Sequence, residues 1–490
     1  FVQESFHLKH WEAAGIKVWR LLRLNLGLEL FFNISKEGEG NQVSKNRKIS
    51  VRLVKMCLTV YKSVKNIIAD FRSNESSNKK SDVTFLVASS TRFFKIDEKW
   101  YNPYYDSFIP FLEKTKKRTN CLEYSSDHQF KVPRFRASAL IQLNLYWCFL
   151  IAFIKSRLHP LKLYQLEGFE EFREYVETNL GSFNYFRYNV LDLRVYVFCE
   201  YKKYFIKKLK NSQAKLTVND GYYSLEGMSF IAASRALNIP AIELQHGVQG
   251  PGHVAYRKWL NTPDNGYEIF PNFFWTWGGS EADYLNSWLC QITGSVAIAG
   301  GNPCLNIYKK DGENIGETYN LRIKSLIAKR NNVNILFTAQ AFFELPAFFL
   351  ESVQSNQNWT FWIRIHPQYL DVKESLKKQL SEIPNTNIIT EEASDFPLAS
   401  LLNFMDLHIT EFSSCVLEAA VSGIKSIVVN ERAEAIYADL IEDKTVYTAY
   451  DKNTLDATIS SILENKGLEL STNQEDIFNQ GLHFLREKLN

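Results

Sequence analysis

The chain has 490 residues, of which 45% are hydrophobic and 14% aromatic, and its formal net charge is +3. This length exceeds a single ordinary core, so we expect two or three globular domains, and a charge this close to neutral argues against nucleic acid as the main partner. The seven cysteines are scattered and form no C-x-x-C pair. This spacing argues against a disulfide framework or a zinc site and fits a reducing compartment such as the cytoplasm.

The first 75 residues are basic and are predicted to be helical. They carry 13 Lys/Arg against 7 Asp/Glu, a net of +6, which leaves about −3 for the rest of the chain. Two interpretations stay open: a basic, aromatic extension that contacts an anionic membrane surface, or a solvated helical extension. The most membrane-like run, 139–154, contains Gln142 and Asn144 and is too short and too polar to span a bilayer. We predict that it is a buried helix.

The rest of the chain alternates short apolar runs with helical patterns, which is typical of an α/β protein with a parallel sheet. Predicted strands in the first half are 83–88, 216–218, 241–244, 273–277 and 296–299. Those in the second half are 333–337, 359–365, 387–389, 407–410, 426–429 and 445–447. We predict two Rossmann-like domains that face a cleft. The expected boundaries are 1–75 for the extension, 76–303 and 304–470 for the two domains, and 471–490 for a closing helix.

Polar residues follow two neighbouring strands of the first half. Asp220 follows strand 216–218 and precedes Gly221, while His246 follows strand 241–244 and is flanked by Gln245 and Gly247. Ligands of open α/β sheets bind at the carboxyl ends of the strands. Asp220 and His246 are therefore predicted to face one crevice.

Two other loops of the first half are candidates for ligand contacts. Arg92 lies in the loop after strand 83–88, where it is either a ligand contact or an ordinary loop charge. Gly301 and Asn302 follow strand 296–299, where a glycine-rich backbone can approach a phosphate closely or simply turn the chain between domains.

The second half ends two of its strands with polar pairs. Arg364, His366 and Pro367 lie at the end of strand 359–365, and Ser413 and Ser414 separate strand 407–410 from a helix. A histidine and serine hydroxyls can donate hydrogen bonds to a nucleotide phosphate. Each pair alone fits an ordinary structural role, and their combination at two strand ends favours a nucleotide site.

Several catalytic signatures are missing from the sequence. There is no Walker loop, no G-x-G-x-x-G after a strand, no H-E-x-x-H, no metal-binding D-x-D pair and no G-x-S-x-G elbow. This pattern favours a metal-independent transferase over an NTPase, a dehydrogenase or a hydrolase.

The set D-G, L-Q-H-G, W-G, G-N-P, R-I-H-P and E-F-S-S resembles the GT-B glycosyltransferases of bacterial surface polysaccharide synthesis. The His-Pro and Ser-Ser motifs resemble those of bacterial polysialyltransferases, and D-G with H-P is similar to the capsule β-Kdo transferases. The R-x-H-P and T-x-x-S-S arrangement is similar to CDP-glycerol glycerophosphotransferases of teichoic acid synthesis. Asn219 stands where the polysialyltransferases have an acid, so the expectation covers the superfamily and a cytidine-type donor.

The resemblance implies a GT-B-like fold and a role for each candidate. Asp220 would be the catalytic base or nucleophile, and His246 would stabilise the leaving phosphate or the sugar carboxylate. The nucleotide contacts would be Arg364, His366, Pro367, Glu411, Ser413, Ser414, Glu418, Gly301 and Asn302. The substrate contacts would be Gln245, Gly247 and Arg92. Neither a metal nor a cofactor is expected beyond the nucleotide-sugar co-substrate.

The implied activity is transfer of a sugar from a CMP-activated acidic sugar, such as Kdo or sialic acid, to a glycan or lipid-linked glycan acceptor. The alternatives are a polyol-phosphate transferase that uses CDP-glycerol, a GT-B-shaped sugar-nucleotide epimerase and a non-catalytic glycan-binding protein. We expect a cytoplasmic protein that can also contact the inner face of the cell membrane, with no nucleic-acid partner.

Overall fold

A computed structural model describes most of the chain. The described residues are 8–24, 26–27, 80–125, 130–180, 187–260, 262–263, 266–289, 294–305, 316–330, 333–339, 345–365, 373–385, 387–465 and 474–489. Most of the predicted N-terminal extension, and both His366 and Pro367, lie outside these residues.

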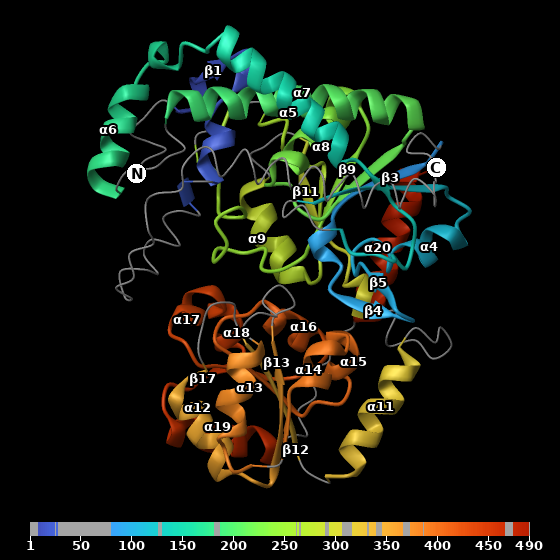
Figure 1. Ribbon diagram of the computed structural model, residues 1–490, viewed down its shortest axis with the longest axis vertical. Helices are drawn as coiled ribbons and strands as arrows, with labels where there is room; N and C mark the ends of the chain where they lie inside the picture. Colours follow the sequence, from blue (N-terminus) through green and yellow to red (C-terminus); the bar gives the residue numbers. More distant parts are fainter. Residues whose placement is uncertain are drawn as a thin grey trace.

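Two separate parallel sheets form the framework of the molecule (Figure 1). The first sheet has seven strands in the order β11-β10-β9-β8-β3-β6-β7. Its strands are β3 (Val83–Ala88), β6 (Thr119–Tyr124), β7 (Ala139–Leu140), β8 (Leu216–Asn219), β9 (Ala241–Leu244), β10 (Phe273–Thr276) and β11 (Val296–Ala299).

The second sheet has six strands in the order β14-β13-β12-β15-β16-β17. Its strands are β12 (Val333–Thr338), β13 (Trp359–Arg364), β14 (Ile388–Ile389), β15 (Leu407–Thr410), β16 (Ser426–Val428) and β17 (Val446–Thr448). Numbered along the chain, this order is 3-2-1-4-5-6, that of the dinucleotide-binding Rossmann fold. The first sheet has the same order with one more strand. The predicted α/β fold with two Rossmann-like domains is therefore confirmed.

The shared strand order fixes where a ligand can bind. Helices cross in opposite directions from the first and fourth strands of each sheet, so a crevice opens at the carboxyl ends of that pair. The pair is β3 and β8 in the first sheet and β12 and β15 in the second. The crevices of the two domains are the natural places to look for the site.

The helices of the first domain cover both faces of its sheet. They are α4 (Ile109–Lys114), α5 (Gln142–Leu158), α6 (Phe169–Leu180), α7 (Tyr188–Ser212), α8 (Leu225–Ala236) and α9 (Gly279–Leu289), with short 3-10 turns η2 (Ser89–Thr91) and η3 (Leu163–Gln165). A small hairpin, β4 (Phe94–Ile96) with β5 (Lys99–Tyr101), projects from the loop after β3. Ser224 caps α8, because its Oγ accepts the amide hydrogen of Gly227 at 2.9 Å.

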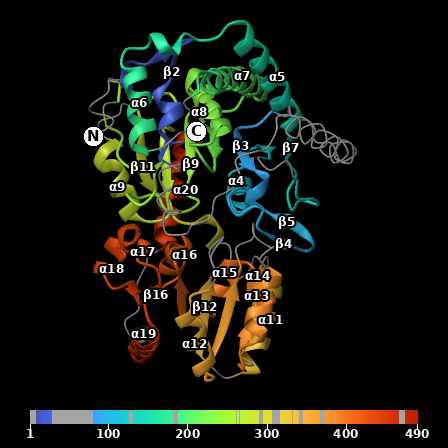
Figure 2. The same cartoon turned by 60° about the vertical axis from the view of Figure 1, so that its left-hand side comes forward.

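The second domain has shorter helices. They are α11 (Glu317–Ala328), α12 (Ala347–Ser355), α13 (Lys373–Ser381), α14 (Glu391–Asp395), α15 (Leu398–Leu402), α16 (Cys415–Val421), α17 (Arg432–Ile436), α18 (Ala438–Glu442) and α19 (Lys452–Glu464). Figure 2 shows α15, α16 and α17 at the end of this domain that is turned toward the first domain.

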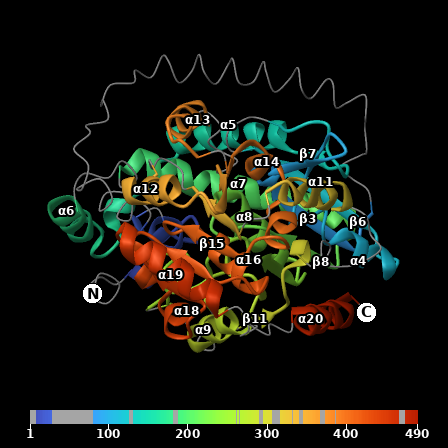
Figure 3. The same cartoon turned by 90° about the horizontal axis from the view of Figure 1, so that it is seen from below.

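The last helix, α20 (Gln474–Leu489), returns to the first domain, as Figures 1 and 3 show. The ring of Phe478 contacts Phe111 of α4 at a centroid distance of 4.6 Å, and the ring of Phe484 contacts Phe273 of β10 at 4.8 Å. The chain therefore crosses between the domains twice, which ties them together at two points.

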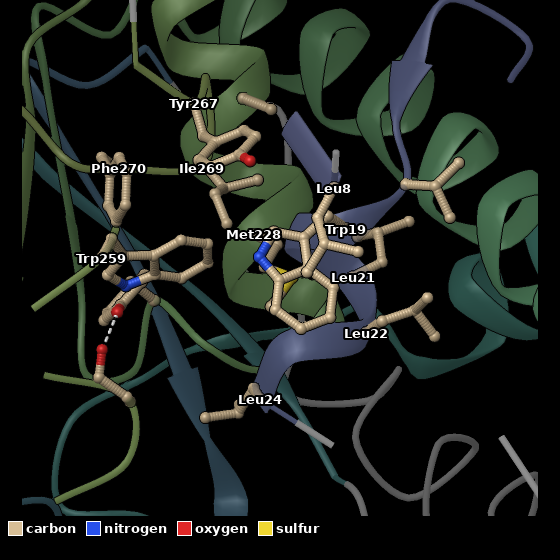
Figure 4. Close-up of a cluster of buried hydrophobic side chains, with 14 of the residues drawn as sticks. Leu8, Trp19, Leu21, Leu22, Leu24, Met228, Trp259, Tyr267, Ile269 and Phe270 are labelled. Carbon is tan, nitrogen blue, oxygen red and sulfur yellow. Dashed lines mark hydrogen bonds between the residues drawn. The ribbon is translucent and has the colours of Figure 1, made fainter. Parts of the chain in front are cut away.

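The described N-terminal residues belong to the core of the first domain. Residues 8–17 form a 3-10 turn, η1 (Leu8–His10), and a hairpin of β1 (Glu12–Ala13) and β2 (Ile16–Lys17), where helices were predicted. The reason is local, because Ala14 and Gly15 take positive φ angles of 52° and 72°, which make a tight hairpin turn. A helical turn follows at residues 19–24. Figure 4 shows its leucines and Trp19 packed against Met228, Trp259 and Phe270.

The prediction of a buried helix at 139–154 is wrong in one respect. A helix does form there, as α5, but only Gln142, Leu145, Ala152 and Ser156 of its residues are buried. Its large apolar side chains are mostly exposed, with Trp147 at 66% and Ile154 at 48%. The small residues face the protein because α7 packs close to α5 along that side.

Candidate active site

A cavity of about 260 Å³ lies between the two domains. The first domain lines it with the end of β9 and the following glycine-rich loop, and the second domain with α17 and the start of α16. Its lining residues are Tyr223, His246, Gly247, Val248, Gly252, His253, Phe412, Ser414 and Ile436. Of the predicted strand-end residues, His246 and Gly247 from the first half of the chain and Ser414 from the second therefore line one cavity.

Two glycines allow the domains to approach each other at this cavity. A Cβ on Gly247 would lie 3.7 Å from Oγ of Ser414, and a Cβ on Gly252 would lie 3.0 Å from Cα of Ile436. A side chain at residue 252 would push against backbone of the second domain. The glycine-rich loop 247–252 of the first domain is thus where the two domains that line the cavity come close together.

His246 is held as a neutral imidazole. Burial lowers the pKa of His246 to about 4. Its Nδ1 lies 3.4 Å from the carbonyl oxygen of Leu244, which can only accept, so Nδ1 carries the proton. Nε2 is then the acceptor for the hydroxyl of Tyr223 at 2.7 Å. In this state both ring nitrogens are engaged by the protein.

His253, which the sequence analysis did not single out, has the opposite tautomer. Burial lowers the pKa of His253 to about 4, so its ring is also neutral. Its Nδ1 accepts the amide hydrogen of Ala255 at 3.2 Å, which places the proton on Nε2. His253 lines the cavity and carries its proton on Nε2, whereas Nε2 of His246 accepts from Tyr223.

Asp220 lies directly after β8, in the crevice between β3 and β8. It is 7% exposed, and its Oδ2 lies 3.2 Å from the hydroxyl of Thr91, which also donates to the carbonyl oxygen of Ala88 at 2.6 Å. Burial raises the pKa of Asp220 to about 7, while the hydrogen bonds from Ala88 and Thr91 oppose this shift. A carboxyl group with a pKa near neutral can take up or release a proton at physiological pH.

Tyrosines connect Asp220 to the cavity. Burial, followed by the nearby Glu418 and Asp220, raises the pKa of Tyr104 well above its ordinary value. The hydroxyl of Tyr104 donates to the carbonyl oxygen of His246 at 3.3 Å. Tyr223 is likewise close enough to Asp220 for that carboxylate to add to the rise of its pKa, which is mainly due to burial. In the sequence, Tyr223 stands three residues after Asp220 in the run D-G-Y-Y, and this short spacing is the pattern that could have predicted that the two side chains lie near each other.

Two acids of the second domain are also held near neutrality. Burial raises the pKa of Glu411 to about 7 against the opposing effect of Asn430 and Arg432. Burial likewise raises the pKa of Glu418 to about 7, and the nearby Arg364 opposes this rise.

Ser413 makes hydrogen bonds within its own domain. Its carbonyl oxygen accepts the hydroxyl hydrogen of Tyr437 at 2.7 Å, and its Oγ accepts the amide hydrogen of Cys415 at 3.3 Å.

Two predicted contacts of the first half instead have structural roles. Arg92 is fully buried, and its guanidinium pairs with Glu123 at 2.9 Å and Asp106 at 3.2 Å. The amide of Gln245 donates to the carbonyl oxygen of Gly247 at 2.9 Å and accepts from the backbone of Trp277 at 2.5 Å. Arg92 is a buried ion pair and Gln245 holds the cavity loop in place.

Three predicted nucleotide contacts also face protein groups. Arg364 donates to the carbonyl oxygens of Ala393 at 2.7 Å and Phe396 at 2.6 Å. Gly301 contacts the Phe478 backbone of α20, with a would-be Cβ only 3.1 Å from its Cα. Asn302 accepts the amide hydrogen of Cys304 at 2.9 Å. The three residues lie at strand ends as predicted, and each contacts other protein groups there.

Among the described residues, no group of three His, Cys, Asp or Glu side chains is placed to hold a metal ion. The polar side chains that line the cavity are those of Tyr223, His246, His253 and Ser414.

No family model matches the chain, and no curated protein sequence matches it. Solved structures to which it is similar include the UDP-GlcNAc 2-epimerase of Neisseria meningitidis bound to UDP-GlcNAc, with 14% identity, a TM-score of 0.48, and 83% of this chain and 99% of that chain covered. Another is the wall teichoic acid polymerase TagF, with 10% identity, a TM-score of 0.47, and 89% and 100% covered. A third is the UDP-GlcNAc 2-epimerase of Methanocaldococcus jannaschii in complex with UDP-GlcNAc and UDP, with 11% identity, a TM-score of 0.46, and 83% and 98% covered.

Proposed function

We propose that this protein is a glycosyltransferase that moves a sugar from a nucleotide-activated donor to a glycan acceptor in the cleft between its domains. The supporting observation is the shared cavity, which His246, Gly247 and His253 line from the first domain and Ser414 from the second. Asp220, with its pKa near 7, is close enough to Tyr223 of this cavity to contribute to the raised pKa of that tyrosine.

Asp220 is the proposed catalytic carboxyl group. When ionised it accepts a proton from the attacking acceptor hydroxyl, or attacks the sugar directly as a nucleophile. A raised pKa makes the carboxylate a stronger base than an exposed aspartate, at the cost of a smaller ionised fraction at neutral pH. The hydroxyl of Thr91 keeps the carboxylate oriented.

His253 and Ser414 are the proposed donors to the leaving phosphate. The tautomers favour His253 over His246, because Nε2 of His253 carries a proton and Nε2 of His246 accepts from Tyr223. His246 then positions Tyr223 and the loop. The donor is proposed to be a CMP-activated acidic sugar such as Kdo or sialic acid, on the basis of the R-I-H-P and E-F-S-S motifs.

A donor panel tests this proposal. Purified protein is incubated with CMP-, CDP-, UDP- and GDP-sugars and with CDP-glycerol, and the nucleotide released is quantified with and without candidate glycan acceptors. We expect acceptor-dependent release of CMP that survives EDTA. Release from CDP-glycerol alone would establish the polyol-phosphate transferase instead, and no turnover with any donor would contradict an enzymatic role.

A sugar-nucleotide epimerase is the second candidate. The observation in its favour is that Glu411 and Glu418, like Asp220, have pKa values raised to about 7 by burial. Several acids near neutrality suit reversible proton transfer on one bound sugar. NMR of the nucleotide-sugar after incubation distinguishes the two, because an epimerase interconverts the donor and needs no acceptor.

A further inference from the structure

Helix α5 is apolar on the side that faces away from the protein. Thirteen large apolar side chains are exposed in the described part of the chain, and eight of them lie on this helix of 17 residues. They are Leu143, Trp147, Phe149, Leu150, Ile151, Phe153, Ile154 and Leu158. Scattered exposed apolar residues are normal, but a contiguous group of this kind marks an interaction surface.

Six of these side chains form one stripe. Residues 143, 147, 150, 151, 154 and 158 follow helical spacing and span roughly 100° of the helix circumference. The buried residues Leu145, Ala152 and Ser156 lie on the opposite side, against α7. The stripe is therefore not a poorly covered part of the core, since the core contact of α5 is made by its other face.

Basic residues dominate the stretch of sequence around this stripe, and Glu200 of the neighbouring α7 is paired with Lys155 of α5 at 2.7 Å. Between Asp127 and Glu167 the sequence has six basic residues and no acidic residue. Arg157 lies at the end of α5, with its guanidinium 5.4 Å from the ring centroid of Phe153, and Lys162 is exposed just beyond it. Lys207, on the neighbouring α7, is also exposed. An apolar stripe with basic residues beside it complements a partner whose interior is apolar and whose outer layer carries negative charges.

We propose that the outer face of α5 docks on an anionic lipid bilayer, with the helix lying in the plane of the interface. The Leu and Ile side chains of the stripe would enter the acyl boundary, Trp147 would lie at the headgroup level, and Arg157 and Lys162 would contact lipid phosphates. The helix is about 25 Å long, which is shorter than a bilayer core of about 30 Å. No helix among the described residues is long and apolar enough to cross a membrane.

The position of α5 is compatible with this docking. Figures 1 and 2 both place α5 at the end of the first domain that is remote from the second domain. The cavity lies between the domains, so it stays accessible when α5 is on a surface. The inference does not depend on the proposed transferase activity, since a bilayer contact and a sugar-nucleotide site use different residues.

The test is flotation of the full chain with vesicles of phosphatidylcholine containing phosphatidylglycerol, and with vesicles of phosphatidylcholine alone. We expect binding to the anionic vesicles that weakens as salt is raised. The double variant Trp147→Glu and Ile154→Glu should lower the bound fraction at least tenfold at the same lipid concentration. The charge variant Arg157→Glu with Lys162→Glu should lower binding to anionic vesicles in the same direction.

The matched control is Leu321→Glu on α11, where an apolar side chain of similar exposure, 60%, stands alone. It should bind vesicles as the unmodified protein does. Circular dichroism and the thermal midpoint should show that each variant is folded. Equal vesicle binding by the double variant, or no binding by the unmodified protein, would overturn the proposal. A dimer detected by light scattering that the double variant abolishes, without vesicle binding, would assign the face to a second copy of the chain.

Discussion

Asp220 and Arg92 are both ionisable residues near the crevice between β3 and β8, but only Arg92 has oppositely charged partners among the described residues. Arg92 meets Glu123 and Asp106 inside the protein, so its charge is neutralised locally. Asp220 receives hydrogen bonds from a hydroxyl and backbone amides, with no cation among the groups that shift its pKa, so burial raises it to about 7. Of the two, Asp220 is the residue left available for proton transfer.

Replacing Asp220 by Asn should abolish most of the transfer activity while leaving the fold intact. The amide keeps the size and the hydrogen bond from Thr91 but cannot accept a proton from an acceptor hydroxyl. Loss of a general base costs roughly 10²–10⁴-fold in rate. Steady-state kinetics with the best donor of the panel, together with nucleotide binding by calorimetry, measure the effect. Activity above about a tenth of the original value would assign the base to another residue, because it falls outside that range.

The pH dependence of the rate should follow the ionisation of Asp220. A base acts in its ionised form, so activity should rise as the pH passes upward through about 7. The hydroxyl of Thr91 favours the ionised form, so Thr91→Val should raise the pKa of Asp220 and move this rising limb to higher pH. Thr91→Ser keeps the hydroxyl and should leave the limb in place. A limb that does not move in Thr91→Val would show that it reports another group.

At the scale of elements, the strands were largely predictable. All eleven predicted strands coincide within two residues with strands of the two sheets, because buried parallel strands are short apolar runs between turn residues. The strand β6 was not predicted, since Asn120 and Glu123 interrupt its apolar pattern. Glu123 is tolerated there because Arg92, 31 residues away, neutralises it. A contact between distant residues is invisible to a local pattern.

The orientation of α5 was also beyond local reasoning. An apolar run predicts burial, and only the packing of α7 against the small residues shows which side faces the protein. The same applies to Gln245 and Arg364, which, like Asn302, were correctly located at strand ends. The partners of Gln245 and Arg364 lie 32 and 29 residues away along the chain, so these two roles required the three-dimensional arrangement. Asn302 instead accepts from Cys304, two residues on, which is a local turn.

The docking of α20 should depend on the glycine at position 300. A Cβ on Gly300, the residue directly after β11, would lie 2.0 Å from the indole of Trp275. This indole is fully buried, and α20 packs over it. Gly300→Ala should therefore lower the free energy of unfolding by about 1–3 kcal/mol, as other overpacked sites do. Urea denaturation measures the change. Gly279→Ala, where no atom lies within 4 Å of the new methyl group, is the control and should be neutral or slightly stabilising.

At the scale of the whole molecule, the two domains share the strand order of the Rossmann fold, and each brings a strand end to the cavity. His246 and Ser414, which the sequence places at strand ends in different halves of the chain, line this one cavity. The sequence could not indicate how closely the two walls approach. That distance depends on the glycines of the loop 247–252, which contact the second domain.

The close approach of the walls should be sensitive to Gly252. A Cβ at this position would lie 3.0 Å from Cα of Ile436, so a valine must displace α17 or the loop. Gly252→Val should hold the domains apart and weaken donor binding by about tenfold or more, which corresponds to about 1.4 kcal/mol. Calorimetry with the donor nucleotide measures this change, and small-angle X-ray scattering should show a larger radius of gyration. In Gly250→Val, whose Cβ has its nearest neighbour at 4.0 Å within its own loop, affinity should be nearly unchanged. Equal donor affinity in the two variants would mean that the nucleotide does not bind between the walls, and the proposed site would have to be moved into one domain.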